Sequence, residues 1–160
     1  MAHKVLVCVD GSEPSKEATR YAVELARAAG LGLIALRVVD VEAYTDKSDE
    51  KREVVKGALE SHADIVLQEA ADMAEEAGVP VERERRYGDS STEIAACAHE
   101  NNDVVLVVLG GSGRRKLLRR PLGSTAERVA RHVAEDIPCP VMVTPSSGFL
   151  IDRRPSYAST

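Results

Sequence analysis

The sequence predicts a single α/β domain built on an open parallel sheet. Short apolar runs alternate along the 160 residues with segments in which apolar residues recur every three or four positions, so strands alternate with helices. This length is that of one domain and is enough to bury a core without disulfides or structural metal. The third of the five expected strands is almost wholly charged, which places it at an edge of the sheet.

The expected strands are short and, apart from the third, rich in valine or leucine. They are Lys4–Val9, Leu31–Val39, Val81–Tyr87, Val104–Leu109 and Val141–Thr144. Only Gly32 and Arg37 interrupt the apolar pattern of the second strand. The fourth is the most apolar and is expected at the centre.

The expected helices are marked by their start and stop residues. Ser12 is expected to cap the first helix, which Gly30 ends. A long helix from about Lys51 to Gly78 follows an acidic loop. Capping boxes at 90–93 and 124–127 open the third and fourth helices, and the fourth ends near Ile137.

These elements fit the strand order 3-2-1-4-5, a Rossmann-like arrangement with helices on both faces. The charged residues from Glu82 to Arg86 require an edge position, whereas the first and fourth strands suit the centre. This order puts the topological switch point between strands 1 and 4, where ligands bind beyond the carboxyl ends. Asp10–Ser12 and Gly110–Gly113 are the residues at those two ends.

A glycine-rich stretch, 110–124, links the fourth strand to the last helix. Gly110, Gly113 and Gly123 let backbone approach a ligand, and Ser124 adds a hydroxyl at a helix start, where N–H groups favour an anion. The stretch also holds five basic residues. It predicts a pocket for a polyanion such as a nucleoside triphosphate, although it matches neither a P-loop nor a dinucleotide fingerprint.

Three segments together resemble the universal stress protein family. They are Val9–Ser12, the pattern Gly-x2-Gly-x9-Gly-Ser at 110–124, and Cys139–Val143. The resemblance covers residues 4–145, nearly the whole of the nucleotide-binding domain expected over residues 1–145, and residues 146–160 extend beyond it as an expected flexible tail. The glycine pattern is specific to the members that bind ATP.

The resemblance implies a nucleotide site. Asp10 would contact the nucleoside, and the backbone at Val39 would contact adenine. Gly110, Gly113, Gly123 and Ser124 would hold ribose and phosphates with Thr125 close by, and Mg²⁺ or Mn²⁺ would assist through phosphate oxygens. On the residues alone, Asp10 could instead be a turn residue, and the arginines around Arg114 could be a solvated face rather than phosphate partners. Pro121 departs from the family pattern and removes one N–H donor.

The sequence is compatible with three functions. We expect an ATP-binding regulatory protein, a homodimer through the last strand, Val141–Thr144, with an unidentified client protein. The alternatives are a scaffold of the same fold that holds no nucleotide and a slow ATPase. We expect no efficient enzyme, because Asp10 is the only evident carboxylate of the site and it lies at the nucleoside end.

Composition narrows the possible partners. The net charge of −5 argues against a general nucleic-acid binder, and no apolar run reaches the length of a signal peptide core or a membrane span. The three cysteines are far apart and lack metal-ligand spacing, so we expect core positions in a reduced, cytoplasmic protein. The four histidines show neither ligand nor triad spacing and are expected to be structural or surface residues, with His62 near the apolar face of the long helix.

Overall fold

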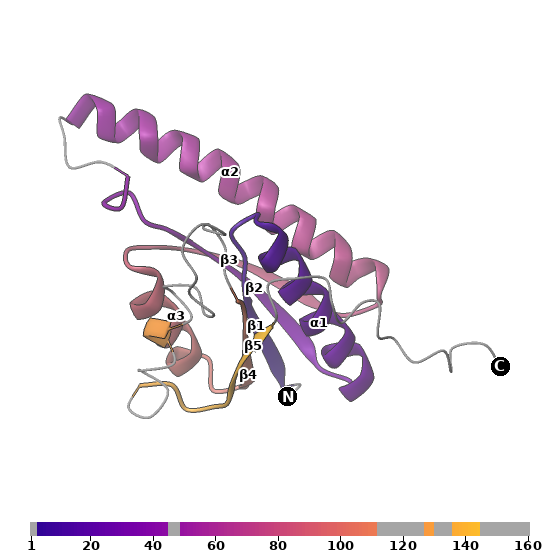
Figure 1. Cartoon of the computed structure of the whole chain (residues 1–160). Coiled ribbons are helices and arrows are strands. Elements are labelled where there is room, and N and C mark those ends of the chain that lie inside the picture. Colours follow the sequence, from indigo (N-terminus) through magenta and orange to yellow (C-terminus); the bar gives the residue numbers. More distant parts are fainter. Residues whose placement is uncertain (1–2, 45–48, 112–126, 130–135, 145–160) are drawn as a thin grey trace.

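The computed structural model describes residues 3–44, 49–111, 127–129 and 136–144 of the chain. It shows a twisted parallel sheet with helices packed on both faces (Figure 1). The elements that have bounds are β1 (Lys4–Cys8), α1 (Glu13–Ala29), β2 (Gly32–Val39), α2 (Asp49–Glu76), β3 (Val81–Tyr87), α3 (Ser90–Glu100), β4 (Val104–Gly110) and β5 (Val141–Thr144).

The strand order is β3-β2-β1-β4-β5, which confirms the order expected from the sequence. All four neighbouring pairs are parallel, and β1 lies between β2 and β4. The chain therefore moves outward from β1 to β3 and then crosses back to β4. The switch point lies between β1 and β4, so the ends of these two strands form the predicted site.

Each face of the sheet has its own apolar core. Side chains of β1 and β2 such as Val7 and Ala35 pack with α1 and α2, through residues such as Ala22 and Ala70. On the other face, side chains such as Leu36 pack against α3. Every residue of β2 is buried, as expected for a strand covered on both faces.

Two of the predicted helix ends are confirmed and one helix start is corrected. Ser12 caps α1 and accepts a hydrogen bond from Ser15 N, and Gly30 ends the helix at φ +68°. The capping box was expected to begin at Ser90, but the residue that caps α3 is Asp89. Its carboxylate accepts hydrogen bonds from Thr92 N and from two hydroxyl groups, and a carboxylate next to the helix N-terminus is also favoured by the helix dipole.

The charged strand β3 keeps its edge position because its side chains pair with the helices beside it. On the α2 face the pairs follow the helix at every fourth residue: Arg83 with Gln68 at 2.6 Å, Arg85 with Asp64 at 3.0 Å and Tyr87 with Glu60 at 2.8 Å. On the α3 face, Arg86 contacts Glu84 at 2.6 Å and Glu100 at 2.5 Å. We name this set of contacts the β3 ladder.

Some expectations lie outside the described residues. They concern most of the glycine stretch, parts of the last helix and the tail 146–160. Residues 127–129 are helical, in line with the fourth expected helix, and Val129 is fully buried in the core beside α3. Arg128 pairs with Asp89 at 2.7 Å, which ties this segment to the start of α3.

Candidate functional site

The turn between β1 and α1 forms the described half of the predicted site. Asp10 accepts two hydrogen bonds through Oδ1, from Ser12 N at 2.9 Å and from Ser12 Oγ at 2.5 Å. Its own N–H donates to Ser15 Oγ at 3.0 Å. The alternative role of Asp10 as a turn residue is therefore seen, while its expected contact with a nucleoside stays a prediction. The carboxylate is held half-buried at the carboxyl end of β1.

The first turn of α1 offers few N–H groups to a ligand. Pro14 has no N–H, and the N–H of Ser15 donates to Ser12 Oγ at 3.3 Å. An anion at this helix start would lose two of the donors that a helix N-terminus usually provides. The β1–α1 turn therefore suits the nucleoside part of a ligand better than its phosphates.

Gly110 brings the end of β4 against the same turn. A Cβ on Gly110 would lie 2.8 Å from the backbone C and O atoms of Pro14 and 3.1 Å from Ser15 N. Real Cβ atoms do not approach backbone this closely, so close packing between β4 and α1 already requires glycine here. The predicted ligand contact of Gly110 is a separate role, which rests on its position next to Asp10 across the switch point.

Val39 lies at the carboxyl end of β2, where the predicted adenine contact was placed. Its side chain is 1% exposed, and its carbonyl oxygen accepts a hydrogen bond from Gly88 N at 3.1 Å. The backbone of Val39 thus completes the pairing between β2 and β3. A carbonyl oxygen has a second lone pair, which an adenine amino group could use.

The structure brings together Asp10 and Gly110, with Val39 on the next strand. The other predicted site residues lie outside the described residues: Gly113, Arg114, Gly123, Ser124 and Thr125. The predicted phosphate half of the site therefore stays a prediction.

Two further residues lie near the site that the sequence analysis did not assign to it. His62 of α2 packs on the β1–α1 turn, because a Cβ on Gly11 would lie 3.1 Å from its Cε1 and Nε2 atoms. Arg37 of β2 is only 8% exposed, two residues before Val39. The sequence feature that could have identified Arg37 is that it is a single cation in an otherwise apolar strand. For His62 it was only the helical spacing to the buried Val66.

The charges of this region act on Cys8, at the end of β1. Burial and the Asp10 carboxylate raise the pKa of its thiol to about 12, and the Arg37 guanidinium opposes them. The thiol is therefore protonated near neutral pH and is a poor nucleophile. Cys97 is similar, because burial and the Glu84 carboxylate also raise its pKa to about 12.

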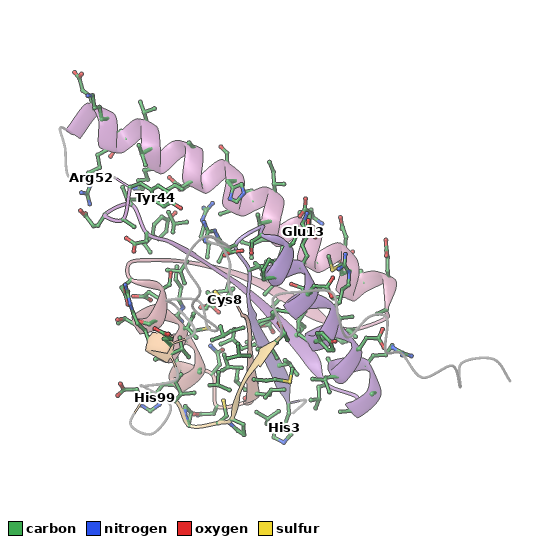
Figure 2. All side chains as sticks on the ribbon, viewed as in Figure 1. His3, Cys8, Glu13, Tyr44, Arg52 and His99 are labelled. Carbon is green, nitrogen blue, oxygen red and sulfur yellow. The ribbon has the colours of Figure 1, made fainter. Side chains whose placement is uncertain are left out.

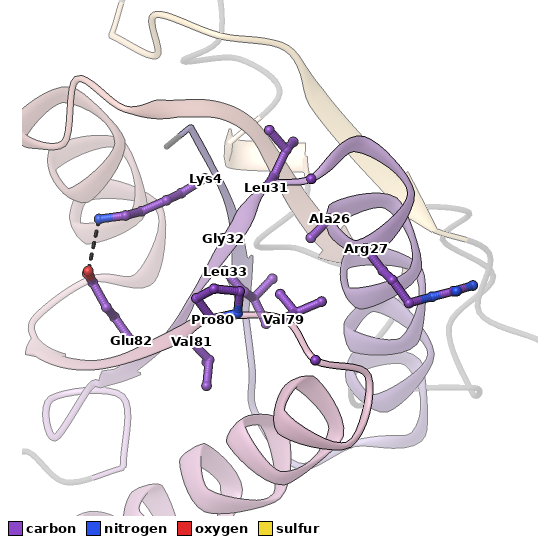
Figure 3. A pocket seen from close by; sticks show the side chains of 12 residues that line it. Lys4, Ala26, Arg27, Leu31, Gly32, Leu33, Val79, Pro80, Val81 and Glu82 are labelled. Carbon is purple, nitrogen blue, oxygen red and sulfur yellow. Dashed lines mark hydrogen bonds and ion pairs between the residues drawn. The ribbon is translucent and has the colours of Figure 1, made fainter. Parts of the chain in front are cut away.

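The two ends of the sheet differ in their chemistry. Cys8 and Glu13 mark the carboxyl end of β1 and the start of α1, whereas His3 and His99 lie toward the opposite end (Figure 2). At that opposite end a cavity of about 310 Å³ has an apolar floor that includes Ala26, Leu33 and Val79 (Figure 3). The ion pair between Lys4 and Glu82, at 2.9 Å, stands at its rim. This cavity is separate from the predicted nucleotide site.

Within the described ranges, no group of three or more His, Cys, Asp or Glu side chains is placed to hold a metal ion. In the same part of the chain, none of the helices combines the length and apolar character needed to cross a membrane.

The strand order, with its switch point between β1 and β4, defines a Rossmann-like α/β protein. Its family is established by sequence: the universal stress protein family matches residues 1–145, and the chain belongs to it. A universal stress protein of Methanocaldococcus jannaschii is 33% identical over 141 residues, which cover 88% of this chain and 80% of that protein.

Solved structures agree with this assignment. A universal stress protein family member from Burkholderia pseudomallei has a TM-score of 0.72 and 26% identity, over 90% of this chain and 96% of that one. UspA from Lactobacillus plantarum has a TM-score of 0.70 and 26% identity, over 89% of this chain and 97% of that one. An Arabidopsis thaliana member solved with AMP bound has the same fold, with a TM-score of 0.64 and 20% identity over 97% of both chains.

Proposed function

We propose that this universal stress protein binds ATP and acts as a nucleotide-dependent regulatory module. The observation that carries the proposal is the position of Asp10 and Gly110 at the carboxyl ends of two neighbouring central strands, β1 and β4. Gly110 also begins the spacing Gly-x2-Gly-x9-Gly-Ser, which supports a phosphate site in the residues that follow.

Other members of this fold hold adenine nucleotides. One universal stress protein was solved with cAMP, at 24% identity, and the Arabidopsis protein with AMP, at 20% identity. These likenesses extend to the fold alone. They support the choice of an adenine nucleotide as the first ligand to test, while the motif residues of this chain support the triphosphate.

The predicted site favours binding over turnover. Its evident carboxylate, Asp10, is engaged with Ser12 through Oδ1. Hydrolysis would need a group that activates water near the γ-phosphate, and the glycine motif supplies neither a carboxylate nor a histidine. A bound nucleotide then acts as a signal that changes a surface for a client protein. The three free cysteines, Cys8, Cys97 and Cys139, support a reducing compartment such as the cytoplasm.

Isothermal titration calorimetry tests the proposal. We expect ATP to bind with a micromolar Kd, about −7 to −8 kcal/mol, with Mg²⁺ assisting through phosphate oxygens. Gly113→Val should abolish binding by occupying the space of the phosphates while the thermal unfolding midpoint stays unchanged. Gly57→Val is the matched control, because nothing lies within 4 Å of a Cβ at this exposed position of α2. A folded Gly113→Val variant that binds ATP normally contradicts the assigned site.

The proposed homodimer forms through β5. This strand is the last in the described sheet, and Val141, Met142 and Val143 are only half-buried. Because Val107 N bonds to Pro140 O, strand alternation directs the backbone groups of 142 and 144 toward β4 and those of 141 and 143 outward. Within the described residues these outward groups form no backbone hydrogen bond, so they can pair with a second copy in the antiparallel sense that the family resemblance implies.

Val143→Pro tests this assembly, because it removes an outward N–H without removing a hydrogen bond to β4. We expect sedimentation to show a dimer for the unmodified chain at tens of micromolar and a monomer for the proline variant. Val143→Ala is the control, since it loses side-chain packing but keeps the N–H. A chain that sediments as a monomer before any substitution overturns the proposed dimer.

A further inference from the structure

We propose that His62 is a further ligand-binding residue, which contacts the nucleoside part of the nucleotide. This inference rests on the proposed function, since it concerns the same site. It adds a residue from α2 to a site otherwise built from strand ends and the glycine stretch.

The first support is the contact between His62 and the β1–α1 turn. A Cβ on Gly11 would lie 3.1 Å from His62 Cε1 and Nε2 and 3.0 Å from Val66 Cγ2. One edge of the imidazole ring therefore lies on the backbone of the residue that follows Asp10. His62 is about fifty residues away from Gly11 in the sequence, so α2 brings it to this turn from a distant part of the chain.

The second support is where His62 lies along α2. Residues 50–62 of the helix include no buried side chain, whereas the next residue, Ala63, is fully buried. His62 thus lies directly before the first buried residue of α2. The residue is exposed, and one edge of its ring lies beside Gly11 at the carboxyl end of β1, where the proposed ligand binds.

The third support is chemical. An imidazole can donate or accept a hydrogen bond to a ribose hydroxyl, and its flat face can stack on a purine. Both contacts are made with the nucleoside. The neighbouring helix start is poorly suited to phosphate, because Pro14 has no N–H and the N–H of Ser15 is bonded to Ser12. The part of the ligand beside His62 is therefore the nucleoside.

The test compares His62→Ala with His99→Ala by calorimetry, using ATP and adenosine as ligands. His99 is also an exposed helix histidine, but it lies toward the opposite end of the sheet (Figure 2). Loss of a hydrogen bond or a stacking contact should weaken both ligands about fivefold or more in His62→Ala, with no change in His99→Ala.

The other possible results contradict either the inference about His62 or the proposed function. Unchanged affinities in His62→Ala overturn the inference and leave the proposed function standing, as long as the unmodified chain binds ATP. A loss for ATP without a loss for adenosine overturns the nucleoside assignment. An unmodified chain that binds neither ligand overturns the proposed function and the inference together.

Nuclear magnetic resonance gives a second readout that needs no substitution. The imidazole signals of His62 should shift on addition of ATP, while those of His3 and His99 stay in place. If ATP shifts the backbone signals around Asp10 but leaves the imidazole signals of His62 unchanged, the proposed contact between His62 and the nucleotide is wrong.

Discussion

Gly11 follows β1 and Gly110 ends the neighbouring strand β4, so both lie at the same switch point, yet the structure requires glycine at the two positions for different reasons. Gly11 adopts φ +83°, a conformation that side chains disfavour, and its closest neighbours are side-chain atoms of His62 and Val66. Gly110 has no positive φ but lies against the backbone of Pro14. A side chain can move away from a new methyl group more easily than a packed helix backbone can.

The comparison shows that a glycine in a binding motif can have a folding role as well. Gly110 would be required by the packing of β4 on α1 even in a chain that held no nucleotide. Substitutions at glycines with different surroundings separate the two roles, because free energy of unfolding and ATP affinity can be measured on the same variants.

The largest effect is expected for Gly110→Ala. The new Cβ would lie 2.8 Å from Pro14 C and O, so β4 and α1 would have to separate. We expect the free energy of unfolding to fall by about 3 kcal/mol, as in other overpacked sites. Urea denaturation measures it, and a denaturation midpoint equal to that of the unmodified chain would show that this packing is not tight.

Gly11→Ala is expected to cost less, about 1–2 kcal/mol, chiefly because alanine disfavours φ +83°. ATP affinity should also fall, since the turn holds Asp10. Gly11→Ala in a His62→Ala background separates the two causes, because the double variant lacks the imidazole contact but keeps the backbone strain. We expect most of the cost to persist. If it disappears, crowding against His62 rather than φ sets the requirement.

Gly30→Ala is expected to cost about 1 kcal/mol and to leave ATP affinity unchanged. Gly30 has φ +68° with no atom within 4 Å of a Cβ, so backbone strain acts there without crowding. It lines the cavity at the opposite end of the sheet. Thermal denaturation and calorimetry measure the two quantities, and an effect on ATP affinity would show coupling between the two ends.

Gly57→Ala gives the smallest effect and the opposite sign. Gly57 lies within α2 at an exposed position with nothing within 4 Å of a Cβ. Alanine is a better helix former, so stability should rise by about 0.5–1 kcal/mol while ATP affinity stays constant. A destabilised variant would indicate that this part of α2 has a packing partner.

The sequence predicted the fold well because its strongest signals are local. Apolar runs marked four of the five strands, whereas β3 was expected only from its place in the alternation of strands and helices. Its charged residues were enough to place it at an edge. The pairing of Arg85 with Asp64 could not be predicted in the same way, since it depends on how α2 lies across the sheet. The start of α3 was misplaced by one residue because Asp89 and Ser90 are both good caps.

The candidate site was predictable in position and less so in detail. Topology alone put Asp10 beside Gly110, whereas the packing of Gly110 on Pro14 required coordinates. His62 was missed because its distance in sequence from Asp10 gives no sign that α2 crosses the β1–α1 turn. Sequence patterns identify residues that share one element or lie at the ends of neighbouring strands. They do not predict contacts between a helix and a turn that are far apart in the sequence.

The β3 ladder has a consequence for growth of the sheet. At one border of the sheet, the charged side chains of β3 pair with the molecule's own helices. The other border of the described sheet, β5, is short and apolar, and it is the border at which we propose that a second copy pairs. If two copies pair through β5 about a twofold axis, they form one ten-stranded sheet. The two outer strands of that sheet are both β3, whose charges disfavour the addition of a further strand. In the proposed dimer, the charged side chains of β3 would therefore oppose further growth of the sheet into fibres.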